Sequence, residues 1–578
     1  MYNKNLWKTK EIISTDKLNN IEQGIYNSSI GGNSIPVVTL TGDASQMTGH
    51  VASNLQFDFN DGEQDVTGYV KTKWQGDSSQ NYPKKNLSFK FYTDSTMSKK
   101  MKWKPKSDWA YDNEYNLKAN YIDRTHARNL VNAKIVAEVY AAQPIYYGNE
   151  NMMPAYLAKF EIKDAIKNAR LDGVIGKQEL SNPLVCSLDV TLNTDKGKDS
   201  SGKSQNFATV WFNDETGAQV GYTQLDLTDT AVGTSKHFSI NIVPSSGHFI
   251  RSAVFNTGVN SKPGDGDVTF SNIALYKGTG EPSGYSYVPS LYDSHQKLQA
   301  SPLFGQVQGF PVEMYLNGKD MGLYTFNTRK NATLVNLDSS DNSNIMIETG
   351  NDNPFWPGHV LKFDGLDADA EVAKDKAIAK KLFQRLITFE QSATNEDFKN
   401  NIAKYVDVYS IIDSYILTFV MNNIDGLDKS VLPTTWDGQH WFLIPYDLDS
   451  TWGSQWDGTR LPYVWDTCRA MNYLSYRVIT LFNDLVLERY SYLRNGVLSA
   501  HNIINEFQNF IDNIPIGLYN NNEKIWPGIP DINYSDFAQI KQAVSTQLAI
   551  TDNAIENNLS DTSSVDTSAT GKGTTINK

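Results

Sequence analysis

The sequence lacks the features of a disulfide-stapled, membrane-spanning or nucleic-acid-binding protein. Two cysteines, Cys186 and Cys468, are too few for a disulfide framework, and we expect both to be buried thiols. There is no apolar run of the roughly 18 residues that a membrane span needs, and the first lysines are not followed by the apolar segment of a secretory signal. A net charge of −13 argues against binding a phosphate backbone, which needs a basic surface.

A chain of 578 residues has room for several domains of about 100–200 residues each. Between residues 147 and 290 the sequence changes character. Short alternating runs at 184–190, 237–242 and 268–276 are separated by loops rich in Gly, Asn, Asp and Ser. This pattern predicts an all-β sandwich.

The most informative stretch is an apolar run, 441–445, that stops at two aspartates, Asp447 and Asp449. On an extended segment residues two apart point the same way, so we expect the two carboxylates to face one site. Like charges so close raise each other's pKa unless a cation lies between them. Oxygen ligands of this kind suit Mg²⁺ or Mn²⁺. The alternative is a pair of turn-forming aspartates at a strand end.

A second aspartate, Asp425, lies in a polar loop after residues 409–421, whose apolar side chains recur at helical spacing. In phosphoryl-transfer enzymes of the protein-kinase type, a loop Asp accepts the hydroxyl proton, a residue five positions later helps to hold metal, and an Asp after a further strand binds the magnesium. Asp425, Ser430 and Asp447 follow that order. The order favours the metal interpretation of the acidic pair.

Four separated blocks resemble the CotH-type atypical kinases, a family named for a bacterial spore-coat protein. They are QGDSS with YPKKN at 75–86, LKANYIDRTHARN at 117–129, GFPV through LNG to GLY at 309–324, and the Asp425 loop with YDLD at 446–449. The resemblance implies an α+β kinase-like fold in two parts, 36–146 (β-rich) and 291–559 (helical). The segment 147–290 would then be an inserted domain, whose two ends emerge close together.

The resemblance also implies roles for individual residues. Asp447 and Asp449 match the metal-binding pair, for Mg or Mn with ATP, and Asp425 matches the loop aspartate. The candidate nucleotide-binding residues are Gln75, Gly76, Ser78, Ser79, Lys85 and Arg128. Lys84 and Lys90 are rivals of Lys85 as the phosphate-binding lysine. Arg124 and Arg128 share a helix face and either clamp a phosphate or pair with Asp123 or Glu138 to fix the fold.

Two departures from the family pattern bear on activity. Ser430 stands where related sequences often have Asn, a better metal ligand. The stretch 324–330, where many members have a Glu that pairs with the nucleotide-site lysine, contains no acid. Nucleotide binding with little or no transfer is therefore one expected outcome.

The ends of the chain differ from the rest. Residues 7–25 resemble an opening found in tail, baseplate and fibre proteins of phages that infect Gram-positive bacteria, where it docks or trimerises. We expect residues 1–35 to be such a docking segment; the alternative is a lid helix on the following β domain. Residues 560–578 have few apolar side chains and are expected to be flexible.

The insert also carries a resemblance. Residues 270–278 are similar to the last strand of carbohydrate-binding jelly rolls in phage tail proteins. Trp211 and Tyr222, with Phe212 and His248, are candidate sugar-stacking residues, although most aromatics of a sandwich belong to its core.

The resulting expectation is a phage virion protein, part of a baseplate or tail appendage, with a CotH kinase-like scaffold. Its expected partners are other virion subunits, copies of itself and host cell-surface polysaccharide. The alternative is an active kinase that transfers phosphate from ATP to a protein hydroxyl. A host-encoded surface or spore protein is a third possibility, which would need an export signal or a coat-targeting partner.

Overall fold

The chain divides into two compact units. The computed structural model describes residues 35–76, 78–146, 156–157, 183–248, 250–256, 267–277, 289–338, 340–347, 376–423, 425–426, 430–461, 472–527 and 537–558. Unit 1 comprises Met1–Ile145, Asp293–Phe398 and Tyr405–Lys578, and unit 2 comprises Tyr146–Tyr292 and Lys399–Lys404. The expected docking segment and the expected flexible tail lie outside the described residues, apart from the last residue of the former.

Unit 1 contains a closed barrel of strands in the order β1-β13-β14-β5-β4-β3-β2. The strands are β1 (Val37–Thr41), β2 (Ser53–Asn60), β3 (Asp65–Trp74), β4 (Leu87–Tyr92), β5 (Glu114–Lys118), β13 (Gly309–Leu316) and β14 (Lys319–Thr328). The side chains of β2 alternate between buried and more exposed, as a strand with one face on a core requires. Phe57 and Phe91 meet edge-to-face inside the barrel, 4.8 Å between ring centroids.

The barrel joins two distant parts of the sequence. β13 and β14 form the hairpin expected at 309–324 and are antiparallel. β14 then pairs with β5, and β13 closes the barrel by pairing in parallel with β1. The four-block pattern did not predict this parallel closure.

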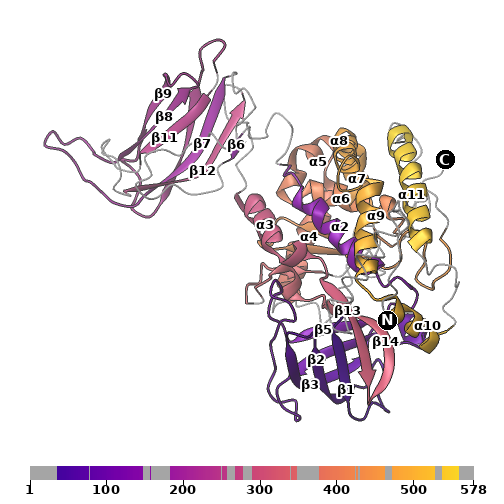
Figure 1. Cartoon of the computed structure of the whole chain (residues 1–578). Helices are drawn as coiled ribbons and strands as arrows, with labels where there is room; N and C mark the ends of the chain where they lie inside the picture. Colours follow the sequence, from indigo (N-terminus) through magenta and orange to yellow (C-terminus); the bar gives the residue numbers. More distant parts are fainter. Residues whose placement is uncertain are drawn as a thin grey trace, which may run out of the picture. The chain divides into compact units, whose positions relative to one another are not determined.

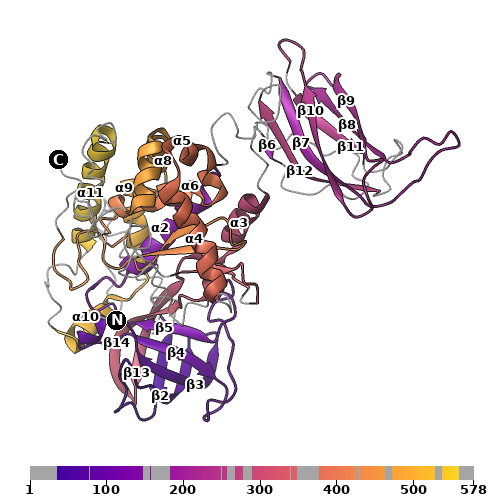
Figure 2. The ribbon, with the colours of Figure 1, turned by 180° about the vertical axis from the view of Figure 1, so that it is seen from behind.

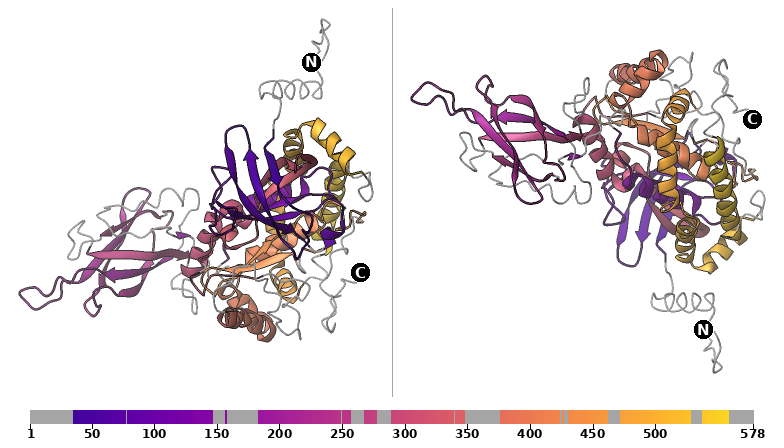
Figure 3. Two further views of the ribbon diagram at one scale, coloured as in Figure 1. Left: turned by 90° about the horizontal axis from the view of Figure 1, so that it is seen from below. Right: turned by 90° about the horizontal axis from the view of Figure 1, so that it is seen from above.

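The rest of unit 1 is mainly helical. Its helices are α2 (Arg128–Ala141), α3 (Pro289–Ala300), α4 (Lys376–Ser392), α5 (Asn395–Asn401), α6 (Val408–Val420), α7 (Tyr473–Leu481), α8 (Asn483–Arg494), α9 (Ala500–Asp512), α10 (Ile516–Ile525) and α11 (Phe537–Asn558). Its short 3-10 turns are η1 (Ser78–Asn81), η5 (Pro302–Gly305) and η6 (Ala332–Val335), and a small sheet has the order β15 (Ile345–Met346), β16 (Val431–Thr435), β17 (Phe442–Pro445). A further 3-10 turn, η8 (Ile402–Lys404), belongs to unit 2. Figures 1 and 2 show barrel strands at one end of unit 1 and helices at the other, and Figure 3 shows both ends.

The central helix of this lobe is α6, predicted from its apolar spacing and buried along its whole length. Its N-cap Asp407 accepts a hydrogen bond from the Ser410 amide at 2.7 Å. In its middle, Asp413 forms a two-point ion pair with Arg489 of α8, at 2.8 and 3.0 Å. Because both partners are fully buried, the pair fixes the two helices against each other.

Unit 2 consists of two antiparallel sheets, ordered β10-β7-β12-β6 and β11-β8-β9. The strands are β6 (Tyr156–Leu157), β7 (Leu184–Leu192), β8 (Phe207–Asp214), β9 (Gln219–Asp226), β10 (Ser235–Ile242), β11 (Ile250–Asn256) and β12 (Val268–Lys277). Alternate side chains from both sheets fill one hydrophobic core. Phe212 belongs to that core, so the expectation that it stacks on a sugar is wrong. Cys186 is buried in that core; Cys468 lies outside the described residues.

Helices and strands together make the protein mixed α+β, as the sequence predicted. Among the described residues, no helix combines the length and apolar character needed to cross a bilayer.

Candidate functional site

The two expected metal-binding aspartates follow strand β17. Asp447 is exposed, whereas Asp449 is closely surrounded by protein and only partly exposed. Burial and the neighbouring Asp447 carboxylate raise the pKa of Asp449 to about 7, while Lys118 and a hydrogen bond from Ser450 act in the opposite direction. The Asp447 carboxylate therefore acts on Asp449 as a nearby like charge does.

The route by which the two side chains come together differs from the expected one. The strand ends at Pro445, Asp447 has a φ of 56°, and Leu448 and Asp449 form a turn. Residue alternation on an extended segment is thus not what brings the carboxylates near each other. A left-handed residue is uncommon for Asp but accessible to it, and nothing in the local sequence announced it.

The loop that carries Asp425 is tied to this acidic turn at both ends. The Trp452 amide donates to the Met421 carbonyl at 2.7 Å, and the Tyr446 amide donates to the Ser430 carbonyl at 3.0 Å. Asp425 lies between these two ties and is 9% exposed. Asp425, Asp447 and Asp449 do not form a three-ligand cluster, since the one such group among the described residues lies in unit 2. Asp425 is accordingly a neighbour of the pair and not a third member of it.

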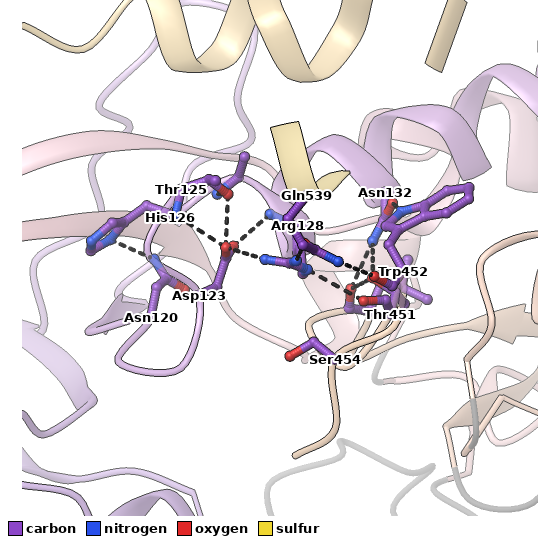
Figure 4. A network of polar contacts seen from close by, with 12 residues as sticks. Asn120, Asp123, Thr125, His126, Arg128, Asn132, Thr451, Trp452, Ser454 and Gln539 are labelled. Atoms are coloured by element: carbon purple, nitrogen blue, oxygen red, sulfur yellow. Dashed lines mark hydrogen bonds and ion pairs between the residues drawn. The ribbon is translucent and has the colours of Figure 1, made fainter. Parts of the chain in front are cut away.

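A polar network holds the acidic turn against helix α2 (Figure 4). The Asn132 amide group donates to the Leu448 carbonyl at 2.9 Å and to Thr451 Oγ1 at 2.8 Å. Its oxygen accepts a hydrogen bond from Trp452 Nε1 at 2.8 Å. Asn132 is fully buried, and a buried polar group that loses its hydrogen bond destabilises the fold, so these bonds are important for the position of the turn. It fixes the residues on both sides of Asp449.

Arg128, expected at the nucleotide, belongs to the same network. Its guanidinium pairs with Asp123 at 2.6 Å and donates to Gln539 Oε1 at 2.6 Å and to the Thr451 carbonyl at 3.3 Å. The side chain is 0% exposed. Arg128 therefore has the fold-fixing contacts that were the alternative for it, and its buried guanidinium is not presented to a ligand.

The lysines at the barrel behave differently from one another. Lys84 is buried, and its Nζ donates to the carbonyls of Ala119 and Leu323 and to Asn522 Oδ1. Burial holds the pKa of Lys84 well below its usual range. Lys90 pairs with Glu114 at 3.1 Å.

Lys85, the preferred candidate, lies over the Trp74 ring at 4.7 Å and donates to the Gln80 carbonyl at 2.7 Å. It is only half-buried, so it is more accessible to an anionic ligand than Lys84 is. Burial lowers its pKa.

The expected phosphate turn lies between β3 and β4. Gly76 has a φ of 99°, and an added Cβ would meet Ser79 Oγ at 2.0 Å, so only glycine fits there. Asn86 ties the turn to the barrel by donating to Ser79 Oγ and accepting from the Ala119 amide. Ser78 and Ser79 are half-buried in η1. Gln75 lies at the start of the turn, and its Oε1 is buried with no hydrogen-bond partner in the described part of the chain.

Three residues near the acidic pair were absent from the sequence-based candidates. Lys118, at the end of β5, acts electrostatically on Asp449. Tyr82 donates to the Trp456 carbonyl at 2.8 Å and stacks on Tyr121, and burial together with Asp457 and Asp449 raises its pKa to about 12. Asn132 is the third. All lie in or beside the recognised blocks, but only the fold brings them to the acidic turn.

The candidate site thus lies in a unit made of a strand barrel and a helical lobe, where a polar loop leads through a hairpin into an acidic turn. Residues 307–550 match the family model for CotH kinase protein. This part of the chain is thus similar to a CotH kinase domain, and the Asp425 loop and the Asp447/Asp449 pair lie within the matched range. The two blocks at 75–86 and 117–129 precede the matched range. No curated protein matches the chain.

Proposed function

We propose that unit 1 binds ATP with Mg²⁺ or Mn²⁺ and transfers the terminal phosphoryl group to a protein hydroxyl. The observation that carries this proposal is the acidic turn after β17, in which Asp447 and Asp449 lie two residues apart and to which the Asp425 loop is hydrogen-bonded at both ends. Hard carboxylate oxygens fit a divalent cation, and binding one would relieve the repulsion that raises the pKa of Asp449. The cation, when bound, neutralises charge on the phosphates.

The other roles follow from position. Asp425 would accept the proton of the acceptor hydroxyl as its oxygen attacks the terminal phosphorus and the bond to the ADP oxygen breaks. Lys85, Ser78 and Ser79, with the backbone around Gly76 and Gln75, would contact phosphate. We leave Arg128 out of the nucleotide site, because its guanidinium is already engaged.

Two features favour slow transfer over fast transfer. Ser430 is a poorer metal ligand than Asn, and the contacts of Lys85 among the described residues are the Trp74 ring and the Gln80 carbonyl, with no carboxylate. Positioning and charge neutralisation supply most of the catalysis in phosphoryl transfer. Binding should therefore be detectable even where turnover is low.

The test is ATP binding to the full chain by calorimetry, with Mn²⁺ and with Mg²⁺. We expect Asp447→Ala/Asp449→Ala to weaken metal-dependent binding by more than about 100-fold, because loss of outer-sphere partners alone costs 10–100-fold. The matched control is Asp484→Ala/Glu488→Ala, which removes two exposed carboxylates from α8. Absence of binding by the folded wild-type chain would eliminate the nucleotide site.

We also propose that unit 2 binds polysaccharide on a host cell surface. Trp211 and Tyr222 are cross-strand partners on β8 and β9, with ring centroids 6.4 Å apart and planes at 27°. Both alternate with core residues and so lie on the outer face, where Tyr222 is 53% exposed. Such a pair of rings offers an apolar platform for sugar faces.

An array of bacterial cell-wall polysaccharides tests this second proposal. We expect Tyr222→Ala and Trp211→Ala each to weaken binding by about tenfold or more, the effect of losing roughly 1.4 kcal/mol of contact. Val232→Ala, at another exposed apolar residue of the same unit, should bind as the wild type does. Equal binding by all three variants would refute the aromatic platform.

The setting that we propose is a phage particle, in which the chain is a baseplate or tail-appendage subunit present in several copies. Its support is the resemblance of residues 7–25 to openings of tail proteins, together with the exposed aromatic pair of unit 2. Labelling of intact particles with an antibody against unit 2 would test it.

A further inference from the structure

Three side chains with metal-ligand chemistry meet at one end of the sheet β11-β8-β9, whose strands are labelled in Figure 1. Asp214 is the last residue of β8, and Glu215 follows it in the turn to β9. Asp214 is the register partner of Ile250, the first residue of β11. His248 comes two residues before Ile250, so strand pairing brings it to the two acids.

The donor atoms lie close together. His248 Nδ1 is 2.6 Å from Glu215 Oε1 and 3.8 Å from Asp214 Oδ2. One ligand atom from each of the three residues lies within 4.8 Å of the others. Small movements would bring all three to the roughly 2.0–2.2 Å at which Zn²⁺ binds nitrogen and carboxylate oxygen.

The turn itself holds Asp214 in a fixed orientation. Its Oδ1 accepts hydrogen bonds from the Thr216 amide and hydroxyl and from the Ala218 amide, at 2.9, 2.6 and 2.9 Å. The residue is only 5% exposed. Asp214 Oδ2 takes no part in these bonds and lies 3.8 Å from His248 Nδ1. A buried carboxylate is thus directed at an imidazole that already contacts a second carboxylate.

A plain His–Asp pair in the same unit looks different. His237 Nδ1 is 2.7 Å from Asp189 Oδ1, and the other oxygen of Asp189 accepts from Asn272 at 2.6 Å. Both oxygens of Asp189 are thus occupied. The His248 group has two acids and an oxygen, Asp214 Oδ2, that no hydrogen bond in the described residues occupies.

We propose that Asp214, Glu215 and His248 form a binding site for a divalent transition-metal ion of the Zn²⁺ class. An imidazole ligand favours Zn²⁺ over Ca²⁺ and Mg²⁺, which prefer oxygen alone. Two carboxylates and a neutral imidazole carry two negative charges, which one such ion compensates. Three protein ligands leave a coordination position open to water or to a polar group of a bound molecule. This site is independent of the proposed nucleotide site in unit 1.

The full chain carrying Asp447→Ala/Asp449→Ala, which lacks the acidic pair of unit 1, provides the background for the experiment. After chelator treatment it is titrated with Zn²⁺ by calorimetry and with Co²⁺ by visible absorption. We expect one site, weakened by more than about 100-fold in His248→Ala and in Asp214→Asn. His237→Ala is the matched control and should bind Zn²⁺ at this site as tightly as the background chain does.

Each other outcome counts against the proposal. Equal binding by the His248→Ala and His237→Ala chains would place the ion elsewhere. Binding only at millimolar Zn²⁺ would mean an adventitious ion only. His248 is 38% exposed at its side chain, so its substitution leaves the core intact, and an unchanged Tm without metal verifies this.

Discussion

Replacing Asn132 with alanine is expected to weaken metal-dependent nucleotide binding by about 10–100-fold, the usual effect of removing a residue that orients metal ligands. The side chain holds Leu448, Thr451 and Trp452, which flank Asp449 on both sides. Without it, Asp449 would no longer be fixed relative to Asp447. Calorimetry with ATP and Mn²⁺ measures the change.

The same substitution should lower the free energy of unfolding by about 3 kcal/mol, because it leaves the Leu448 carbonyl and Trp452 Nε1 buried without their partner. Asn129→Ala, on the same helix, separates the two effects. Asn129 is buried, and its Oδ1 has no hydrogen-bond partner among the described residues. The Asn129→Ala chain should retain both nucleotide binding and the free energy of unfolding. If Asn132→Ala binds ATP normally when folded, Asn132 serves the fold alone.

Raising the pH from about 5 to about 9 should remove several kcal/mol of the stabilisation that Glu390 and Asp407 contribute to the folded protein, on the order of 3–6. Burial raises the pKa of Glu390 to about 9 and that of Asp407 to about 7. Both groups keep their protons in the folded state at a pH where the unfolded chain releases them. The stabilisation is complete below the unfolded values near 4 and is lost as the pH rises through 7 and then 9.

Urea unfolding at a series of pH values measures this slope. Glu390→Gln and Asp407→Asn remove the titrating groups, and the asparagine keeps the oxygen that caps α6. The double variant should show a smaller loss of unfolding free energy between about pH 5 and about pH 9 than the wild type does. Glu396→Gln, at an exposed position on α5, should leave this loss unchanged. If the stabilities of the wild type and of the double variant changed equally with pH, the prediction would be contradicted.

Local patterns predicted many of the elements because their causes are local. The apolar spacing in residues 409–421 predicted α6, and alternation at 184–190 predicted β7. The GFPV block predicted the β13–β14 hairpin. For α6 and β7 the spacing of the apolar side chains shows the period of the element without knowledge of what packs on it, and for the hairpin the prediction rests on the family resemblance.

Features that depend on partners far away in the sequence escaped prediction. Which lysine of the pair Lys84–Lys85 is buried depends on distant contacts, such as the hydrogen bond from Lys84 to Asn522, hundreds of residues downstream. The role of Asn132 depends on a turn more than 300 residues away. The left-handed Asp447 shows the same limit in the backbone, because nothing in its local sequence indicates that conformation.

The strands of the barrel are synthesised at two separate times. β1 to β5 leave the ribosome before unit 2, whereas their edge partners β13 and β14 follow it. Translation at about 5–20 residues per second would leave the outer edges of β1 and β5 unpaired for roughly ten seconds or longer. Open edges of this kind recruit other chains. Unit 2 can fold during that interval, so the nascent chain would carry a finished domain beside a half-built barrel that still has to be protected from aggregation.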